Sequence, residues 1–192
     1  MSDIQASTPI YKAVFSQISR ITSGSEPLRR AILAKLRRGA GKHPGSVPEI
    51  WEYTIGSLPD DIAYKSESEW AVHAALTLFA VHKQGADNTV TGTSGGTLGS
   101  AVAKLCTDKN KDAITRRFNS AVTADGIEGL TVHARSLVQM LRVGKIDMDY
   151  QKFAEELFSW QFNREKTRLE WGRDYWYIIN KSANENQGDK KQ

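Results

Sequence analysis

Cysteine and long hydrophobic runs are scarce in this 192-residue sequence. The single cysteine, Cys106, cannot form a disulfide within the chain, so the cytoplasm is the expected compartment. No run of about 18 residues is apolar throughout, which excludes a membrane-spanning helix. The first residues, Met1 to Gln5, lack the basic stretch and apolar core of a secretory signal. We therefore expect a cytoplasmic protein that makes no contact with a membrane.

Alternating runs of β-branched residues, which mark strands, are also missing. The only hint, Thr89-Val90-Thr91, lies inside a glycine-rich segment. Apolar residues instead recur at helical spacing along almost the whole chain, and 40% of the residues are hydrophobic, which is enough for a real core. The sequence therefore predicts an all-α fold, a bundle of about eight or nine helices that could divide into two lobes.

Capping and stop residues locate the predicted helices. Ser25 can cap a helix that stops at Gly39. Ser66 and Glu69 spell the capping box of another helix, which extends to His82. Later helices are expected near residues 98–106, 112–123, 127–143, 150–162 and 166–179.

A segment rich in glycine, threonine and serine, residues 85–97, separates the early helices from the later ones. It predicts a flexible loop between an N-terminal helical lobe, residues 1–84, and a C-terminal helical lobe, residues 98–181. The polar tail at residues 182–192 is predicted to be disordered.

Charge is distributed unevenly, although the net charge is only +4. Residues 10–45 carry eight Lys or Arg against one acid, and residues 101–120 carry five against two. Residues 46–79 carry one Lys against six acids. Such blocks predict a basic surface and a separate acidic surface, which fits a subunit of an assembly.

The first basic block contains a motif that suits phosphate binding. Arg30 and Arg37 lie seven residues apart, so they fall on one line of a helix, with Arg38 beside them. Arginine binds phosphate through two parallel hydrogen bonds and keeps its charge at any relevant pH. The candidate contacts in this region are Arg29, Arg30, Lys35, Arg37, Arg38 and Lys42. The alternative is a helix face that is simply solvated.

Two later helices add to this basic surface. Arg116 and Arg117 form a second pair, and Phe118 beside them follows the apolar phase, which favours a core position. Arg135 and Arg142, again seven residues apart, share the polar side of the next helix. Together these positions outline a basic stripe that could contact nucleic acid.

Aromatic residues near the C-terminus could be taken for a base-stacking surface. Trp171, Tyr175 and Ile178, however, recur at intervals of four and three residues, as on the inner face of a helix. The spacing therefore predicts that this stretch belongs to the core.

Catalytic patterns are weak. Residues 92–96 match the Gly-x-Ser-x-Gly pattern of a hydrolase nucleophile, but that motif needs a strand that turns into a helix. The four histidines are scattered without metal-ligand spacing, and the acidic pairs at 60–61 and 147/149 fit turns and helix caps. We expect neither an enzyme nor a bound metal or cofactor.

Three stretches in order resemble one family. They are RRAILAKLRRGAGKHPG (29–45), DAITRRFNSAV (112–122) and RLEWGRDYW (168–176), and residues 137–160 are similar to a helix pair of the same family. The sequence resembles CasB, the small subunit of the type I-E CRISPR Cascade complex.

The resemblance implies an α-helical, non-catalytic subunit that is present as two copies beside other Cascade subunits. It implies contacts with the backbones of guide RNA and target DNA and with the displaced strand, which would stabilise the R-loop. The matching motif positions are Arg29, Arg30, Arg37, Arg38, Arg116 and Arg117. The alternative function is a helical adaptor whose basic patches dock acidic protein partners.

Overall fold

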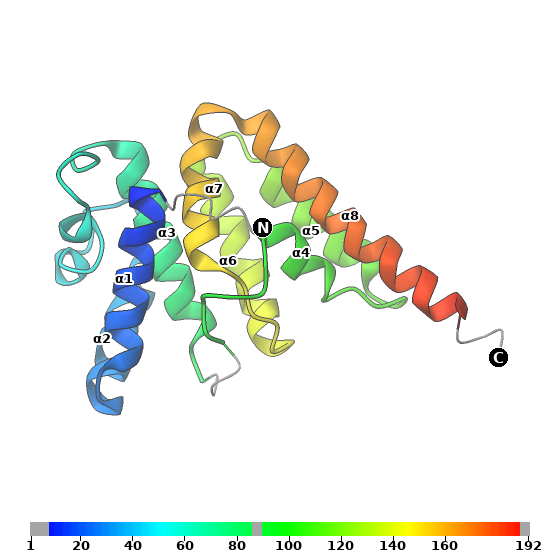
Figure 1. Ribbon diagram of the computed structural model, residues 1–192, viewed down its shortest axis with the longest axis horizontal. Coiled ribbons are helices and arrows are strands. Elements are labelled where there is room, and N and C mark those ends of the chain that lie inside the picture. The colour runs from blue at the N-terminus through cyan, green and yellow to red at the C-terminus, as the bar shows by residue number, and fades with distance from the viewer. Residues whose placement is uncertain (1–7, 86–89, 189–192) are drawn as a thin grey trace, which may run out of the picture.

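The computed structural model describes residues 8–85 and 90–188 (Figure 1). Within these residues the chain forms eight α-helices and two short 3-10 helices, without a strand. They are α1 (Pro9–Ser23), α2 (Glu26–Gly39), η1 (Pro48–Ile50), η2 (Ile55–Ser57), α3 (Ser66–His82), α4 (Leu98–Ala103), α5 (Lys111–Val122), α6 (Ile127–Val143), α7 (Tyr150–Phe162) and α8 (Arg164–Gly188). The predicted all-α fold is confirmed.

Helix α3 is the centre of the bundle, because every residue from Trp70 to His82 is buried. A helix that is buried on all sides needs neighbours on all sides, and α3 packs against α1, α2, α6 and α7. Gly39 allows the end of α2 to approach closely. A Cβ at this position would lie 2.6 Å from Ile50 Cδ1 and 3.0 Å from Thr77 Cγ2. The last turn of α2 is therefore held against α3.

Helix α8 lies along α4 and α7, and its C-terminal part extends away from the rest of the bundle (Figure 1). Gly99 of α4 makes the crossing with α8 possible. A Cβ on Gly99 would lie 2.1 Å from the carbonyl oxygen of Trp171, so no larger residue fits without moving the two helices apart.

Two of the C-terminal aromatic residues lie in the core between these helices. Trp171 and Tyr175 are fully buried, and Phe118 stacks on Tyr175 with ring centroids 4.6 Å apart. Trp171 and Tyr175 thus form core as predicted, whereas Phe162, Trp176 and Tyr177 are exposed, so the prediction that the whole stretch belongs to the core is wrong for these three residues. In the next turn, Ile179 is buried and Ile178 only partly so, which shifts the predicted inner face by one residue.

Some helix boundaries differ from the predicted ones. Helix α8 continues to Gly188, beyond the predicted start of the tail, because neither glycine nor proline interrupts residues 173–187. Residues 189–192 of that tail lie outside the described residues. Helix α4 ends early, at Ala103. The side chains of Ser25 and Ser66 make no capping hydrogen bond, so the predicted caps are wrong in that respect.

The hydrophobic core crosses the predicted lobe boundary. One cluster of buried residues extends from Ile10 in α1 to Ile179 in α8. Helix α3 from the first predicted lobe packs directly on α6 and α7 from the second. The division into lobes 1–84 and 98–181 stays a prediction. The packing of α3 against both α2 and α6 brings the basic residues of different sequence blocks together.

Candidate nucleic-acid interface

Two of the arginines predicted on α2 are paired with carboxylates. Arg30 forms an ion pair with Glu26, one turn earlier in the same helix. Arg38 Nη1 lies 2.9 Å from Glu49 Oε1, which follows α2 in the first 3-10 helix. Exposed pairs of this kind contribute little to stability, but each carboxylate balances a positive charge at short range. We refer to Arg30 and Arg38 as the paired arginines.

Arg37 points away from Arg38, toward the C-terminal end of α3. Its Nη1 donates to the carbonyl oxygen of Ala80 at 3.5 Å, and the carbonyls of this last turn have no partner within the helix. Partial burial, and then the positive charge of Arg142, lower the pKa of Arg37. Two guanidinium groups from different helices therefore act on each other at this point.

Arg142 and Arg135 extend from α6 toward α3 and α2. Arg142 Nη1 donates to Gln84 Oε1 at 3.0 Å, and Arg135 Nη1 donates to the carbonyl oxygen of Ala40 at 3.1 Å. Ala40 is the C-cap of α2, where the helix dipole favours a cation. Both acceptors are neutral, so neither arginine contacts a full negative charge.

Arg117 continues the basic residues from α6 onto α5. Its Nη1 donates to Ser136 Oγ at 3.4 Å, again a neutral acceptor. Arg116 is exposed on the same helix, whereas Phe118 is buried, as predicted. The four arginines with neutral acceptors at the junction of α2, α3, α5 and α6 are Arg37, Arg142, Arg135 and Arg117, and we call them the arginine row.

The remaining predicted residues lie around this row. Lys42 is exposed, two residues beyond the carbonyl that Arg135 contacts. Lys35 and Arg29 are half-buried along α2. Arg168, which was not predicted as a contact, also bonds only neutral oxygens. It donates to the carbonyls of Val122 and Ala124 and thereby caps the end of α5.

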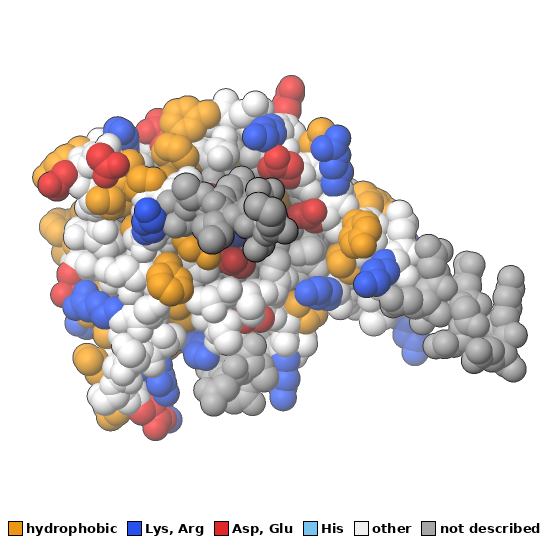
Figure 2. Space-filling model, viewed as in Figure 1, with side chains coloured by type: hydrophobic (Ala, Val, Ile, Leu, Met, Phe, Trp, Pro, Cys, Tyr) orange, Lys and Arg blue, Asp and Glu red, His pale blue; other side chains and the backbone are white. Residues whose placement is uncertain are grey.

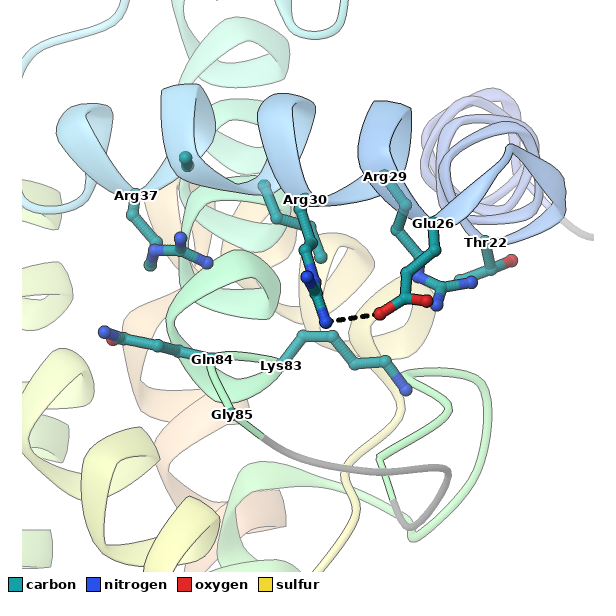
Figure 3. Close-up of a pocket in the computed structure, with 10 residues that line it drawn as sticks. Thr22, Glu26, Arg29, Arg30, Arg37, Lys83, Gln84 and Gly85 are labelled. Carbon is teal, nitrogen blue, oxygen red and sulfur yellow. Dashed lines mark ion pairs between the residues drawn. The ribbon is translucent and has the colours of Figure 1, made fainter.

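A cleft of about 760 Å³ lies between α2 and the segment that follows α3 (Figure 3). Its lining residues are Thr22, Glu26, Arg29, Arg30, Leu33, Ala34, Arg37, Lys83, Gln84 and Gly85. Lys83 Nζ donates to the carbonyl oxygen of Val90, which ties the two ends of the following loop together. The sequence did not predict Lys83 and Gln84 as site residues, because single polar residues after an apolar helix form no recognisable pattern.

Asp147, in the connection between α6 and α7, holds the Gly/Thr/Ser segment in place. Its carboxylate accepts hydrogen bonds from Thr91 N at 2.9 Å, Gly92 N at 3.1 Å and Ser94 Oγ at 3.1 Å. Burial alone would raise the pKa of Asp147, but hydrogen bonds from Thr91, Gly92 and Met148 outweigh it and lower the pKa. Ser94 therefore anchors a loop. Residues 86–89 of the predicted flexible loop lie outside the described residues, and its flexibility stays a prediction.

The most strongly perturbed titratable groups are in the core. Glu156 Oε2 accepts from Trp171 Nε1 at 2.7 Å, and burial raises the pKa of Glu156 to about 8. His82 Nδ1 lies 3.1 Å from Tyr150 Oη, and burial lowers the pKa of His82 to about 4. Both side chains are closed off from solvent, so a substrate could not reach either of them.

No group of three or more His, Cys, Asp or Glu residues is arranged to hold a metal ion in the part of the chain that the structure describes. Across residues 8–85 and 90–188, none of the helices is long and apolar enough to cross a membrane. On the face shown in Figure 2, basic and acidic side chains are interspersed. The arginine row differs from that mixed surface because the acceptors in contact with it are neutral.

Comparisons with known proteins cover most of the chain. Residues 32–176 match the family described as CRISPR-associated protein Cse2. The structure is similar to CasB from Thermobifida fusca, with a TM-score of 0.72 and 28% identity over 88% of this chain and 99% of that chain. A chain of a CRISPR RNA-guided surveillance complex shares the fold (TM-score 0.73, 21% identity, 92% and 99% covered). So does M. ruber CasB (TM-score 0.67, 23% identity, 91% and 97% covered). No curated protein sequence matches.

Proposed function

Because this chain belongs to the CRISPR-associated protein Cse2 family, to which the CasB proteins also belong, we propose that it is a non-catalytic subunit of an RNA-guided surveillance complex. In that complex it would contact the other Cascade subunits, a second copy of itself, and the backbones of guide RNA and target DNA. It would also hold the displaced DNA strand and so stabilise the R-loop. In such systems base pairing reads the sequence and the protein contacts the backbone.

The observation that carries this proposal is the arginine row. A guanidinium has five N–H donors, and each arginine of the row uses one nitrogen on a neutral protein oxygen. The internal hydrogen bond fixes the direction of the side chain, while the other donors and the full charge stay available to a phosphate. Side chains that are held in place lose less conformational entropy when they bind.

The spacing of the row suits a nucleic-acid backbone. Arg135 and Arg142 lie seven residues apart on α6, which is about 10 Å along the helix axis. Successive phosphates of one strand advance about 3.4 Å each along duplex DNA, so this separation spans about three nucleotides. Contacts of this kind position a strand without reading its bases, which supports sequence-independent binding.

A salt titration tests the proposal. If all four arginines of the row contact phosphates, log Kobs should fall with log salt concentration with a slope of about −3 to −4. Fluorescence anisotropy with two labelled DNA molecules of unrelated sequence should give the same slope and similar affinities. Binding that ignores salt, or that differs greatly between the two sequences, would contradict the proposal.

A helical adaptor that binds proteins is the second candidate. One observation favours it: Trp51 and Tyr64 are exposed by 42% and 97%, within the acidic segment 46–79. Exposed aromatic residues beside acids suit a basic protein partner, whereas acidic partners would dock on the basic patches. Purification of the tagged chain from its own cells separates the candidates, since a nuclease-sensitive particle containing RNA supports the first and an RNA-free protein complex supports the second.

A further inference from the structure

The cleft beside α2 contains hydrogen-bond acceptors as well as cations (Figure 3). The Thr22 hydroxyl already donates to the carbonyl oxygen of Ile18 at 2.8 Å, so toward a ligand it can act only as an acceptor. The Glu26 carboxylate uses Oε1 in its ion pair with Arg30. Its lone pairs on Oε2 therefore remain available to a donor from a ligand.

Cations surround these acceptors. Four basic side chains and one acidic side chain line the cleft, which gives a net charge of +3. Arg29 and Arg30 flank Glu26 at one end, and Arg37 stands two turns further along α2 (Figure 3). Between them lie the aliphatic side chains of Leu33 and Ala34. A fitting ligand needs an anionic group, a hydroxyl donor beside it, and a part that packs on aliphatic carbon.

We propose that this cleft binds a ribonucleotide unit and prefers it to the deoxy form. The phosphate binds the Arg29 guanidinium, the 2′-hydroxyl donates to Glu26, and the base packs on Ala34 beside the largely buried Leu33. A carboxylate that accepts from ribose hydroxyls, close to bound phosphate, is a known way to recognise this unit, and the 2′-hydroxyl is what separates RNA from DNA. With deoxyribose the same carboxylate would face the phosphate without a donor, which costs affinity.

This inference rests on the proposed function, because it states which kind of nucleic acid, RNA or DNA, one part of the basic surface prefers. A cleft of about 760 Å³ has the size of a small-molecule site, so free ribonucleotide and RNA are two sources of the same ligand chemistry. Adenosine monophosphate and a short single-stranded oligoadenylate, each in ribo and deoxy form, are the probes that distinguish them.

The test is the ratio of RNA to DNA affinity for the full-length chain, measured by calorimetry at low salt. We expect the wild type to prefer the ribo form about tenfold, the value of one charge-assisted hydrogen bond. A ribo-over-deoxy preference that appears only with the oligonucleotide assigns the cleft to an RNA strand, and the same preference with the monophosphate assigns it to a free nucleotide.

Glu26→Ala is the decisive variant. Removal of a negative charge alone should tighten RNA and DNA equally, whereas loss of ribose recognition should bring the ratio close to one. Glu49→Ala, which removes the carboxylate partner of Arg38, is the matched control and should leave the ratio unchanged. Ala34→Trp should fill the cleft and weaken RNA more than DNA.

Two different failures are distinguishable. If the wild type binds RNA and DNA equally, and Glu26→Ala changes both in parallel, the ribonucleotide inference is wrong and the proposed function stands. If the wild type binds neither probe strand at low salt, the proposed function fails as well.

Discussion

Arg37 and Arg38 are neighbours in the sequence, yet they lie in opposite electrostatic environments. Arg38 contacts the Glu49 carboxylate, whereas Arg37 contacts a carbonyl oxygen and lies close enough to Arg142 for its pKa to be lowered. The same contrast separates the paired arginines from the whole arginine row. The number of basic residues in a segment therefore does not predict the charge that a ligand experiences there. A carboxylate in contact with an arginine balances its charge, whereas a neutral oxygen does not.

The row and the paired arginines also differ in what holds them. The row arginines bond carbonyls at the ends of α2 and α3, an amide and a hydroxyl, all contributed by segments other than their own helices. The paired arginines bond carboxylates of α2 itself or of the turn that follows it. The row thus depends on the packing of α3 against α2 and α6 and of α5 against α6, and it is a property of the fold rather than of one segment.

The largest expected effect is on the stability of the core, which supports both the arginine row and the paired arginines. Burial raises the pKa of Glu156 from 4.5 to about 8, so the folded state holds a proton that the unfolded chain releases. The stability from this group is present below pH 4.5 and is lost as pH rises to about 8, on the order of 5 kcal/mol in total. Urea denaturation of Glu156→Gln should show this loss abolished, with DNA affinity unchanged. If the stability of the wild type did not change between pH 4.5 and about 8, the raised pKa of Glu156 would be wrong.

The next effect should come from giving a row arginine a carboxylate partner. Gln84→Glu would place a negative charge on the acceptor of Arg142 and turn it into a paired arginine. We expect DNA binding to weaken about tenfold, because one phosphate contact is lost and a repulsive charge is added. Gln84→Ala is the control and should bind almost as the wild type does. Equal effects of the two changes in an anisotropy titration would show that the amide, not the charge, matters.

The smallest effect should come from the reverse change. Glu49→Gln removes the partner of Arg38 and leaves that guanidinium uncompensated. DNA binding should tighten about threefold, since one exposed cation becomes available. Glu170→Gln, which releases Lys166 on α8, changes the net charge by the same amount and should have less effect. Tightening of equal size in both variants would mean that net charge alone governs binding.

Helical spacing predicted the fold and much of the core, because burial of an apolar face decides where a helix lies. Trp171, Tyr175 and Phe118 are all buried as their phase indicated. The split between Arg37 and Arg38 was not predictable in the same way, since Glu49 reaches Arg38 only through a turn that leaves the helix. The contact between Arg142 and Gln84 joins residues 58 positions apart, and no local pattern contains it.

The loop after α3 also makes long-range contacts that no local sequence pattern predicts. Its glycines, threonines and serine read as a flexible linker, but several of them bond one carboxylate, Asp147, more than 50 residues away. Gly95 approaches that site so closely that a Cβ would lie 2.1 Å from the carbonyl oxygen of Asp147. The composition of the segment indicates that it can turn, but it does not identify Asp147 as the residue that holds the turn in place.

The most direct test compares two double variants that remove the same charge. Arg37→Ala with Arg142→Ala removes half of the arginine row, and Arg30→Ala with Arg38→Ala removes both paired arginines. At moderate salt, with thermal stability measured in parallel, the first should weaken DNA binding on the order of 30-fold and the second by no more than about threefold. Equal losses in the two variants would contradict the claim that the neutral-partner arginines form the nucleic-acid surface.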